Sequence, residues 1–218
     1  RIATRTVENE DGDEDIIYLT GINQSHSGIE TEFAGQMTEN LRVDVGASLG
    51  KWIYSDDASG SYRDSDGSTE SYNYALKDLR VGDMPQASFN FGITSTHIEG
   101  ATVQLTARHY SLFFSDWSPT SREYSSDDDA DRSQSWRTPP YTVFDLNASY
   151  NLPVDFGGIT PQLTLNVRNL FDAVYIQDSV DNSRFNAVPF RVNSHSANSA
   201  EVYLGMPTSF NLGLKVNF

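Results

Sequence analysis

The chain has 218 residues, with 30 acidic against 15 basic side chains and a formal net charge of −15 at pH 7. Nucleic acid is not expected as a partner, because binding a phosphate backbone requires a basic face that releases counterions. The absence of cysteine excludes disulfides, thiolate metal ligands and a cysteine nucleophile. No run of 18 apolar residues occurs, which excludes a transmembrane helix.

Apolar and polar residues alternate along most of the chain, which is the period of a β-strand with two unlike faces. The C-terminal run is the most regular: Phe210, Leu212, Leu214 and Val216 alternate with polar residues or glycine, and the run ends at Phe218. The pattern predicts an all-β chain with about eight antiparallel strands, near residues 1–8, 15–37, 41–54, 87–94, 103–114, 141–150, 163–168 and 210–218.

Short and long connections alternate between these strands. Short turns are predicted at Thr38–Asn40, Ile98–Gly100 and Asn151–Ile159, and long polar segments at about 55–82, 116–140 and 172–207. A bacterial outer-membrane barrel has this asymmetry, with short periplasmic turns and long external loops. An acidic secreted sandwich, such as a carbohydrate-binding module, explains the alternation but not the loops, nor strands longer than about five or six residues. We therefore predict an antiparallel transmembrane β-barrel.

The two faces of the predicted strands differ in chemistry. The apolar alternants are expected to face lipid. The opposite face is expected to line a wide, wet interior, because it carries mixed charges: Glu30, Glu32, Arg42, Asp44, Arg108, Asp145, Arg168 and Lys215. Aromatic residues near the outer strand ends, including Trp52, Tyr54 and Phe114, are expected in a belt at the membrane interface.

Three segments resemble TonB-dependent outer-membrane receptors. The segment 166–172 followed by Tyr175 resembles the penultimate-strand signature of that family, an Asn-Leu-Phe-Asp-x-x-Tyr pattern carried here by Asn169, Leu170, Phe171, Asp172 and Tyr175. The ending 206–218 resembles the final strand, which closes on phenylalanine, and the segment 26–30 resembles a mid-barrel strand.

The resemblance implies a barrel of about twenty-two strands that is filled by an N-terminal plug. Residues 1–218 would then be the C-terminal portion, roughly the last third of the barrel, with the plug and the earlier strands absent. The expected function is TonB-energised uptake of a scarce nutrient, of siderophore, cobalamin, saccharide or peptide class, across the outer membrane of a Gram-negative bacterium. The alternatives are a passive porin and a small, complete eight-stranded structural barrel, since eight strands can also close.

The same resemblance implies several partners. The TonB complex would bind through the absent N-terminal region, and the barrel assembly machinery would read Phe218 as an assembly signal. The wall would contact outer-membrane lipid and lipopolysaccharide. The ligand would be a small-molecule or oligomeric nutrient.

No catalytic motif is present, so we expect no enzyme. The four histidines, His26, His97, His109 and His195, show no metal-ligand spacing, and neither a metal nor a cofactor is expected. The acidic segment 64–67 resembles the start of a calcium loop but lacks the glutamate at the twelfth position. Solvated loop charge explains it and the other acidic clusters.

Aromatic residues in the long segments are the candidate ligand contacts, because rings stack on sugars, chelators and peptides alike. They are Tyr62, Tyr72, Tyr74, Trp117, Tyr124, Trp136, Phe185, Phe190 and Tyr203. The acidity of the loops should repel anionic chelates and favour neutral or cationic ligands. Deleting residues 120–135 is expected to cut no strand.

Overall fold

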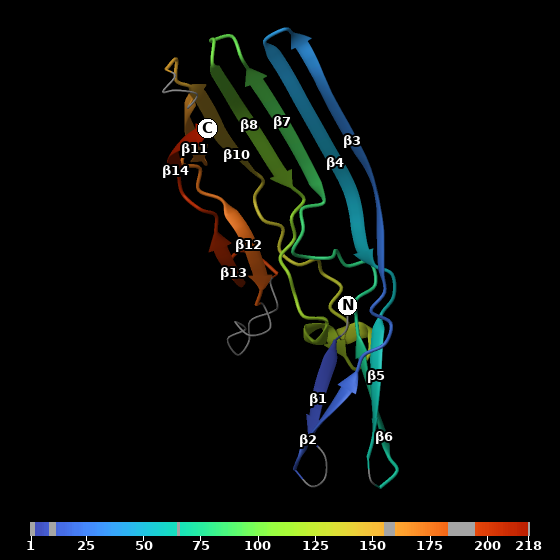
Figure 1. Ribbon diagram of the computed structural model, residues 1–218. Coiled ribbons are helices and arrows are strands. Elements are labelled where there is room, and N and C mark those ends of the chain that lie inside the picture. Colours follow the sequence, from blue (N-terminus) through green and yellow to red (C-terminus); the bar gives the residue numbers. More distant parts are fainter. Residues whose placement is uncertain (1–2, 9–11, 65, 155–159, 183–194, 218) are drawn as a thin grey trace.

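The computed structural model describes residues 3–8, 12–64, 66–154, 160–182 and 195–217. Its largest element is a seven-stranded antiparallel sheet, here called the wall, with the order β14-β11-β10-β8-β7-β4-β3 (Figure 1). The strands are β3 (Gln24–Thr38), β4 (Leu41–Tyr54), β7 (Ala87–Ser95), β8 (Ala101–Ser111), β10 (Tyr141–Asn151), β11 (Thr160–Arg168) and β14 (Ser209–Asn217). Each wall strand pairs with its neighbour along the chain, and the predicted antiparallel all-β fold is confirmed.

The register of the wall confirms that its two faces differ. Val45 lies between Phe33 and Phe91 on the neighbouring strands, so apolar side chains share one face. Directly paired residues of an antiparallel sheet point to the same side. The alternate positions of each strand, which point to the other side of the sheet, hold the eight charged residues that were expected to face inward. Within the described chain the apolar face has no second layer over it, and Ile29 keeps 72% of its surface exposed.

The wall is an open sheet. Its order ends at β14 and β3, so the described residues do not form the closed eight-stranded barrel considered as an alternative. The expected strand at residues 1–8 also differs, because β1 (Thr4–Glu8) forms a separate hairpin with β2 (Glu14–Tyr18). Gly21 interrupts the expected strand 15–37: its φ is +83°, and a Cβ there would lie 2.4 Å from the carbonyl oxygen of Asp57.

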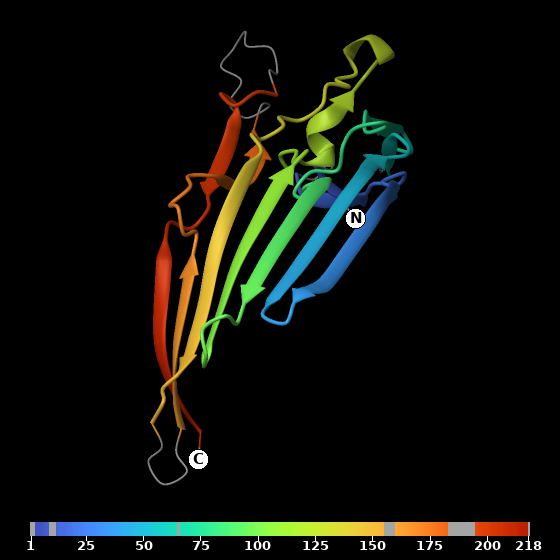
Figure 2. The ribbon, with the colours of Figure 1, turned by 90° about the horizontal axis from the view of Figure 1, so that it is seen from above.

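All three long connections leave the same end of the wall, as the sequence predicted (Figures 1 and 2). Between β4 and β7 lie β5 (Ala58–Arg63) and β6 (Thr69–Tyr74). The β8–β10 connection holds two 3-10 helices, Pro119–Arg122 and Asp127–Asp129, with β9 (Glu123–Tyr124) between them. The β11–β14 connection holds β12 (Ile176–Asp181) and β13 (Ala200–Leu204). Neither helix, nor any other in the described part of the chain, is long and apolar enough to cross a membrane.

The principal buried core lies in these connections, not in the wall. We call the connections and the N-terminal hairpin together the loop assembly. Its buried cluster consists of Leu19, Ile22, Tyr54, Ala58, Tyr74, Leu76, Leu79 and Trp117. The prediction that Trp52 and Tyr54 join a lipid-facing belt is wrong, because their register places them on the polar face of β4. Tyr54 is 1% exposed and packs on Trp117 with ring centroids 5.1 Å apart.

Candidate functional site

Backbone pairing joins the connections of the loop assembly to one another. β9 pairs with β6 through Asn73–Tyr124 and Tyr74–Glu123, which forms a three-stranded sheet with β5. A parallel bridge between Asp116 and Val180 connects the β8–β10 segment to β12. The long connections at this end of the wall therefore form one connected layer of chain, in contrast to three independent loops.

Asp57 connects two of these segments through its carboxylate. Arg132 donates two hydrogen bonds to it, at 2.9 and 2.7 Å. The backbone N–H groups of Leu76 and Lys77 donate two more, each at 2.9 Å. Donation by the Arg132 guanidinium is the main cause that lowers the pKa of Asp57 to about 2. Asp57 therefore stays ionised at any physiological pH.

His195 connects the β8–β10 connection to the β11–β14 connection. Its Nε2 lies 2.6 Å from a carboxylate oxygen of Asp131 and its Nδ1 lies 2.5 Å from one of Asp181. Burial lowers the pKa of His195, but the hydrogen bonds to the two carboxylates outweigh it and raise the pKa to about 9. The imidazolium is thus the charged partner of both acids. No sequence signal marks this cluster, because its members lie 14 and 64 residues apart.

Arg122 extends the same cluster into the core. Its side chain is 1% exposed, forms an ion pair with Asp131 at 3.1 Å and lies 5.2 Å from the ring of Trp117. Its Nε and Nη2 have no hydrogen-bond partner within the described structure. A buried guanidinium with two free donors is costly, and burial lowers its pKa. The carboxylate of Asp131 offsets part of that cost.

The structure divides the predicted ligand-contacting rings by exposure. Tyr74 and Trp117 are 0% and 3% exposed, so their contacts are those of the core. Trp136 is half-buried, and Tyr203 keeps 49% of its surface exposed. Two further members of the set, Phe185 and Phe190, lie outside the described residues, as does Phe218, the predicted assembly signal.

The remaining predicted rings cluster around the N-terminal hairpin and β6. Tyr62 donates a hydrogen bond to Asp15 at 3.0 Å. Tyr72 lies beneath the guanidinium of Arg5, 3.9 Å from its centre, and its hydroxyl donates to Glu70. Tyr124 lines a hollow together with Arg5 and Tyr72. These rings are partly exposed.

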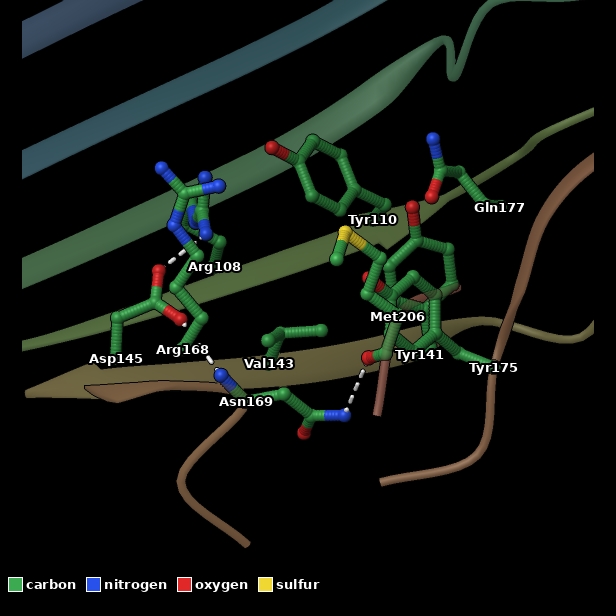
Figure 3. A pocket seen from close by; sticks show the side chains of 10 residues that line it. All are labelled: Arg108, Tyr110, Tyr141, Val143, Asp145, Arg168, Asn169, Tyr175, Gln177 and Met206. Atoms are coloured by element: carbon green, nitrogen blue, oxygen red, sulfur yellow. Dashed lines mark hydrogen bonds and ion pairs between the residues drawn. The ribbon is translucent and has the colours of Figure 1, made fainter. Parts of the chain in front are cut away.

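A cavity of about 380 Å³ opens on the polar face where β8, β10 and β11 end (Figure 3). We call it the wall cavity. Its lining includes two arginines, one carboxylate and three tyrosines: Arg108, Arg168, Asp145, Tyr110, Tyr141 and Tyr175. Only Tyr175 of these six was singled out for the family pattern, and none was predicted as a ligand contact. The alternation of apolar and polar residues could have identified the other five residues, since all five lie in wall strands and share the polar face.

The three tyrosines form a continuous stack. Tyr110 and Tyr141 have ring centroids 5.3 Å apart, and Tyr141 and Tyr175 are stacked at 4.5 Å. The far side of Tyr175 rests on Gly205, where an added Cβ would lie 1.9 Å from the ring. The absence of a side chain at position 205 is therefore required by this packing.

The family-like segment 169–172 forms the turn that ends β11 and positions Tyr175. Asn169 and Asp172 have φ of +49° and +51°, a region that asparagine and aspartate tolerate better than other side chains. The buried Asn169 amide donates to the carbonyls of Ala173 and Met206 and accepts from the N–H of Ala173. The carboxylate of Asp172 accepts the N–H of Thr208 at 2.9 Å. The turn thereby ties β11 to the start of β14.

The two apolar members of this segment lie differently. The N–H of Leu170 donates to the carbonyl of Phe144 at 2.7 Å. Phe171 is 67% exposed and meets the Phe144 ring edge to face at 5.1 Å. Because Phe144 belongs to the apolar face, Phe171 extends that face at the looped end of the wall.

Among the described residues, no group of three or more histidine, aspartate or glutamate side chains could hold a metal ion. In the acidic segment 64–67, the carboxylate of Asp66 accepts the N–H of Ser68 at 2.6 Å. This contact is that of a local turn.

Comparison with known families gave one match. The model of the family described as "TonB dependent receptor-like, beta-barrel" matches residues 1–170. The comparison with curated proteins gave no match. The matched region covers six of the seven wall strands and the first two long connections.

Proposed function

The chain belongs to the family of TonB-dependent receptor-like β-barrels, and we propose that it forms the ligand-binding and membrane-spanning part of a receptor for energised nutrient uptake. Members of this family are outer-membrane receptors and transporters of Gram-negative bacteria, and they are not enzymes. The chain is therefore part of an outer-membrane receptor or transporter. The nutrient, the energy coupling and the location in the cell belong to the proposal.

One observation carries this proposal. A two-faced wall has a polar surface that leads from a cavity at its looped end toward its short-turn end. A nutrient caught at the looped end would travel along such a surface, because charged and amide side chains replace its water contacts. The partly exposed rings Tyr62, Tyr72, Tyr124 and Trp136, and the exposed ring of Tyr203, belong to the loop assembly and are proposed as first contacts. The proposed ligands are those of the family in general: siderophore, cobalamin, saccharide or peptide.

We further propose that residues 1–218 are the C-terminal portion of a larger barrel. The free edges of β3 and β14 support this, since unpaired strand edges cannot remain in a membrane interior. A region N-terminal to these strands would bind the TonB complex, the apolar face would contact lipid and lipopolysaccharide, and Phe218 would be read by the assembly machinery. Residues 1–218 refolded alone in detergent should give no heat-modifiable monomer. A compact monomeric barrel in that experiment would contradict the proposal.

A passive porin is the second candidate, because a polar-lined wall also suits diffusion. Uptake by the intact receptor in whole cells separates the two candidates. The compounds of spent culture medium, separated by mass, serve as the candidate ligands. An energised receptor should lose uptake, but keep surface binding, when TonB is deleted or the proton gradient is collapsed. Uptake that continues without energy would favour the porin.

Loop deletion is a poorer test than the sequence suggested. The expectation that removal of residues 120–135 cuts no strand is wrong, because β9 lies inside that segment. The same deletion removes Arg122, Asp131 and Arg132, which hold the loop assembly together. A loss of ligand binding after this deletion would therefore not identify a contact residue, and substitution of single exposed rings such as Trp136 is preferable.

A further inference from the structure

The charges of the wall cavity do not cancel. Asp145 is the only carboxylate among the lining residues, against the two guanidiniums of Arg108 and Arg168. One oxygen of Asp145 is ion-paired with Arg108, and the other accepts the N–H of Asn169 at 2.9 Å. Arg168 is exposed and has no ion pair within the described residues. Figure 3 shows both arginines on the same side of the strands as the carboxylate. The cavity therefore has a formal charge of +1, and Arg168 carries the unneutralised charge.

The remaining polar groups of the cavity can both donate and accept hydrogen bonds. The hydroxyls of Tyr110, Tyr141 and Tyr175 have no hydrogen-bond partner among the described residues, and all three rings line the cavity. The amide of Gln177 lies in the same lining. The inner ring faces of the tyrosine stack are already occupied by one another and by Gly205. The stack thus presents hydroxyl groups and ring edges to a ligand more than open aromatic faces.

We propose that the wall cavity binds a carboxylate-bearing, hydroxyl-rich ligand of about the size of a sugar acid, with Arg168 as the partner of the carboxylate. A guanidinium is suited to this role, because its planar fork matches a carboxylate with two parallel hydrogen bonds. The tyrosine hydroxyls and Gln177 would receive the ligand's hydroxyl groups. The cavity, at about 380 Å³, lies near the lower end of the range for small-molecule sites. This inference rests on the proposed receptor function and names its ligand class.

The ligand class differs from the one that net charge favours. The chain carries a formal charge of −15, from which a neutral or cationic ligand was expected. Exposed charges are screened beyond about 8 Å at physiological ionic strength. A guanidinium in direct contact with a carboxylate is screened far less. The local charge of the cavity therefore decides which ligand stays bound, and the loop charges act on its approach.

The test uses the purified intact receptor and two probes that share one ring, D-galacturonate and its neutral amide, D-galacturonamide. Isothermal titration calorimetry should show about ten-fold tighter binding of galacturonate, as expected for one charge-assisted bidentate contact. Arg168→Gln should reduce that preference to about two-fold. Lys215→Gln is the matched control, because it removes a positive charge from the same face, near the short-turn end of the wall, and should leave the preference unchanged.

A second variant keeps the test decisive if Arg168→Gln fails to fold. Tyr175→Phe removes only a hydroxyl, and should weaken both probes about three-fold without changing their ratio. Equal binding of the two probes, or binding of neither, would overturn the proposal. If Arg168→Gln weakened the binding of both probes equally, the proposal would also be overturned. Arg168 would then be the partner of a carboxylate of the receptor's own chain.

A failure of this proposal can be told apart from a failure of the proposed function, because binding to purified receptor needs no energised membrane. Preferential binding of galacturonate without energy-dependent uptake would contradict the receptor function and leave the cavity assignment intact. Energy-dependent uptake without a preference for the carboxylate would do the reverse.

Discussion

In the wall, Ile29 and Leu212 keep 72% and 70% of their surfaces exposed, whereas in the loop assembly Tyr74 and Leu76 keep none. Continuous backbone pairing holds the wall together, and its apolar face has no protein layer over it in the described chain. The loop assembly has short strands, but it buries a cluster of aromatic and aliphatic side chains and is linked by ion pairs. The wall thus depends on its surroundings for the burial of its side chains, and the loop assembly supplies its own core.

The largest effect should come from removing a ring of the loop core. Trp117→Ala deletes a side chain that is 3% exposed and should destabilise the loop assembly by about 3–5 kcal/mol, since large-to-small core changes cost this much. Hydrogen exchange of the intact receptor would show lost protection in residues 55–86 and 112–140, with the wall unchanged. Trp136→Ala, at a half-buried ring, is the control. Equal protection in both variants would show that the loops have no core of their own.

The wall should respond to charge on one face only. Leu214→Arg places a charge on the apolar face of β14 and should cost about 2–4 kcal/mol near the bilayer midplane. Asn211→Arg places the same charge on the polar face of the same strand and should cost little. Unfolding titrations of the intact receptor in lipid vesicles measure both. Similar losses for the two variants would contradict the assignment of faces.

The turn that joins the two regions should be sensitive to a single amide. Asn169→Ala removes three hydrogen bonds and forces alanine to a φ of +49°, which together should cost about 2–3 kcal/mol. Asn169→Gly loses the same bonds without the strain and should cost about 1 kcal/mol less. Thermal unfolding of the two variants compares them. A glycine variant no more stable than the alanine variant would remove backbone strain from the explanation.

The smallest effect concerns pH and is confined to the loop assembly. The pKa of His195 is raised from 6.5 to about 9, so its contribution to stability is complete below pH 6.5 and is lost as pH rises through 9. The pKa of Asp131 is lowered from 3.8, so its contribution is complete above pH 3.8 and is lost in more acidic solution. Among the described residues, Asp131 and Asp181 face His195, and Arg122 reaches it through Asp131.

Limited proteolysis of the intact receptor measures this pH effect. Cleavage within residues 112–140 should increase between pH 6.5 and 9, because the loop assembly should lose stability over this interval. After allowance for solvent screening, the loss should be on the order of 1–2 kcal/mol. His195→Gln should abolish the alkaline dependence. Asp57 and Arg132 titrate outside this interval, so their link should hold throughout. An unchanged pH profile in the glutamine variant would mean that His195 is not the titrating group.

The wall was predictable from the sequence because apolar and polar residues alternate along its strands. Val45, Phe91 and Leu212 fall on one face in any antiparallel meander with short turns, and the same parity places Arg108 and Arg168 on the other. The same parity places Trp52 and Tyr54 on the polar face. The prediction of a belt at the membrane interface relied instead on their position near a strand end. The side of the long connections was likewise predictable, since it follows from strand direction alone.

The loop assembly depended on contacts that no local pattern encodes. Asp57 meets Arg132, and Asp131 meets His195, across 75 and 64 residues respectively. The separation of residues 1–8 from the wall follows from the turn at Gly21, and the burial of Tyr74 and Trp117 follows from the packing of several connections against each other. Short-range alternation determines which way a side chain points in a sheet. Only the tertiary structure determines which distant segments cover it, because that depends on the closure of long connections.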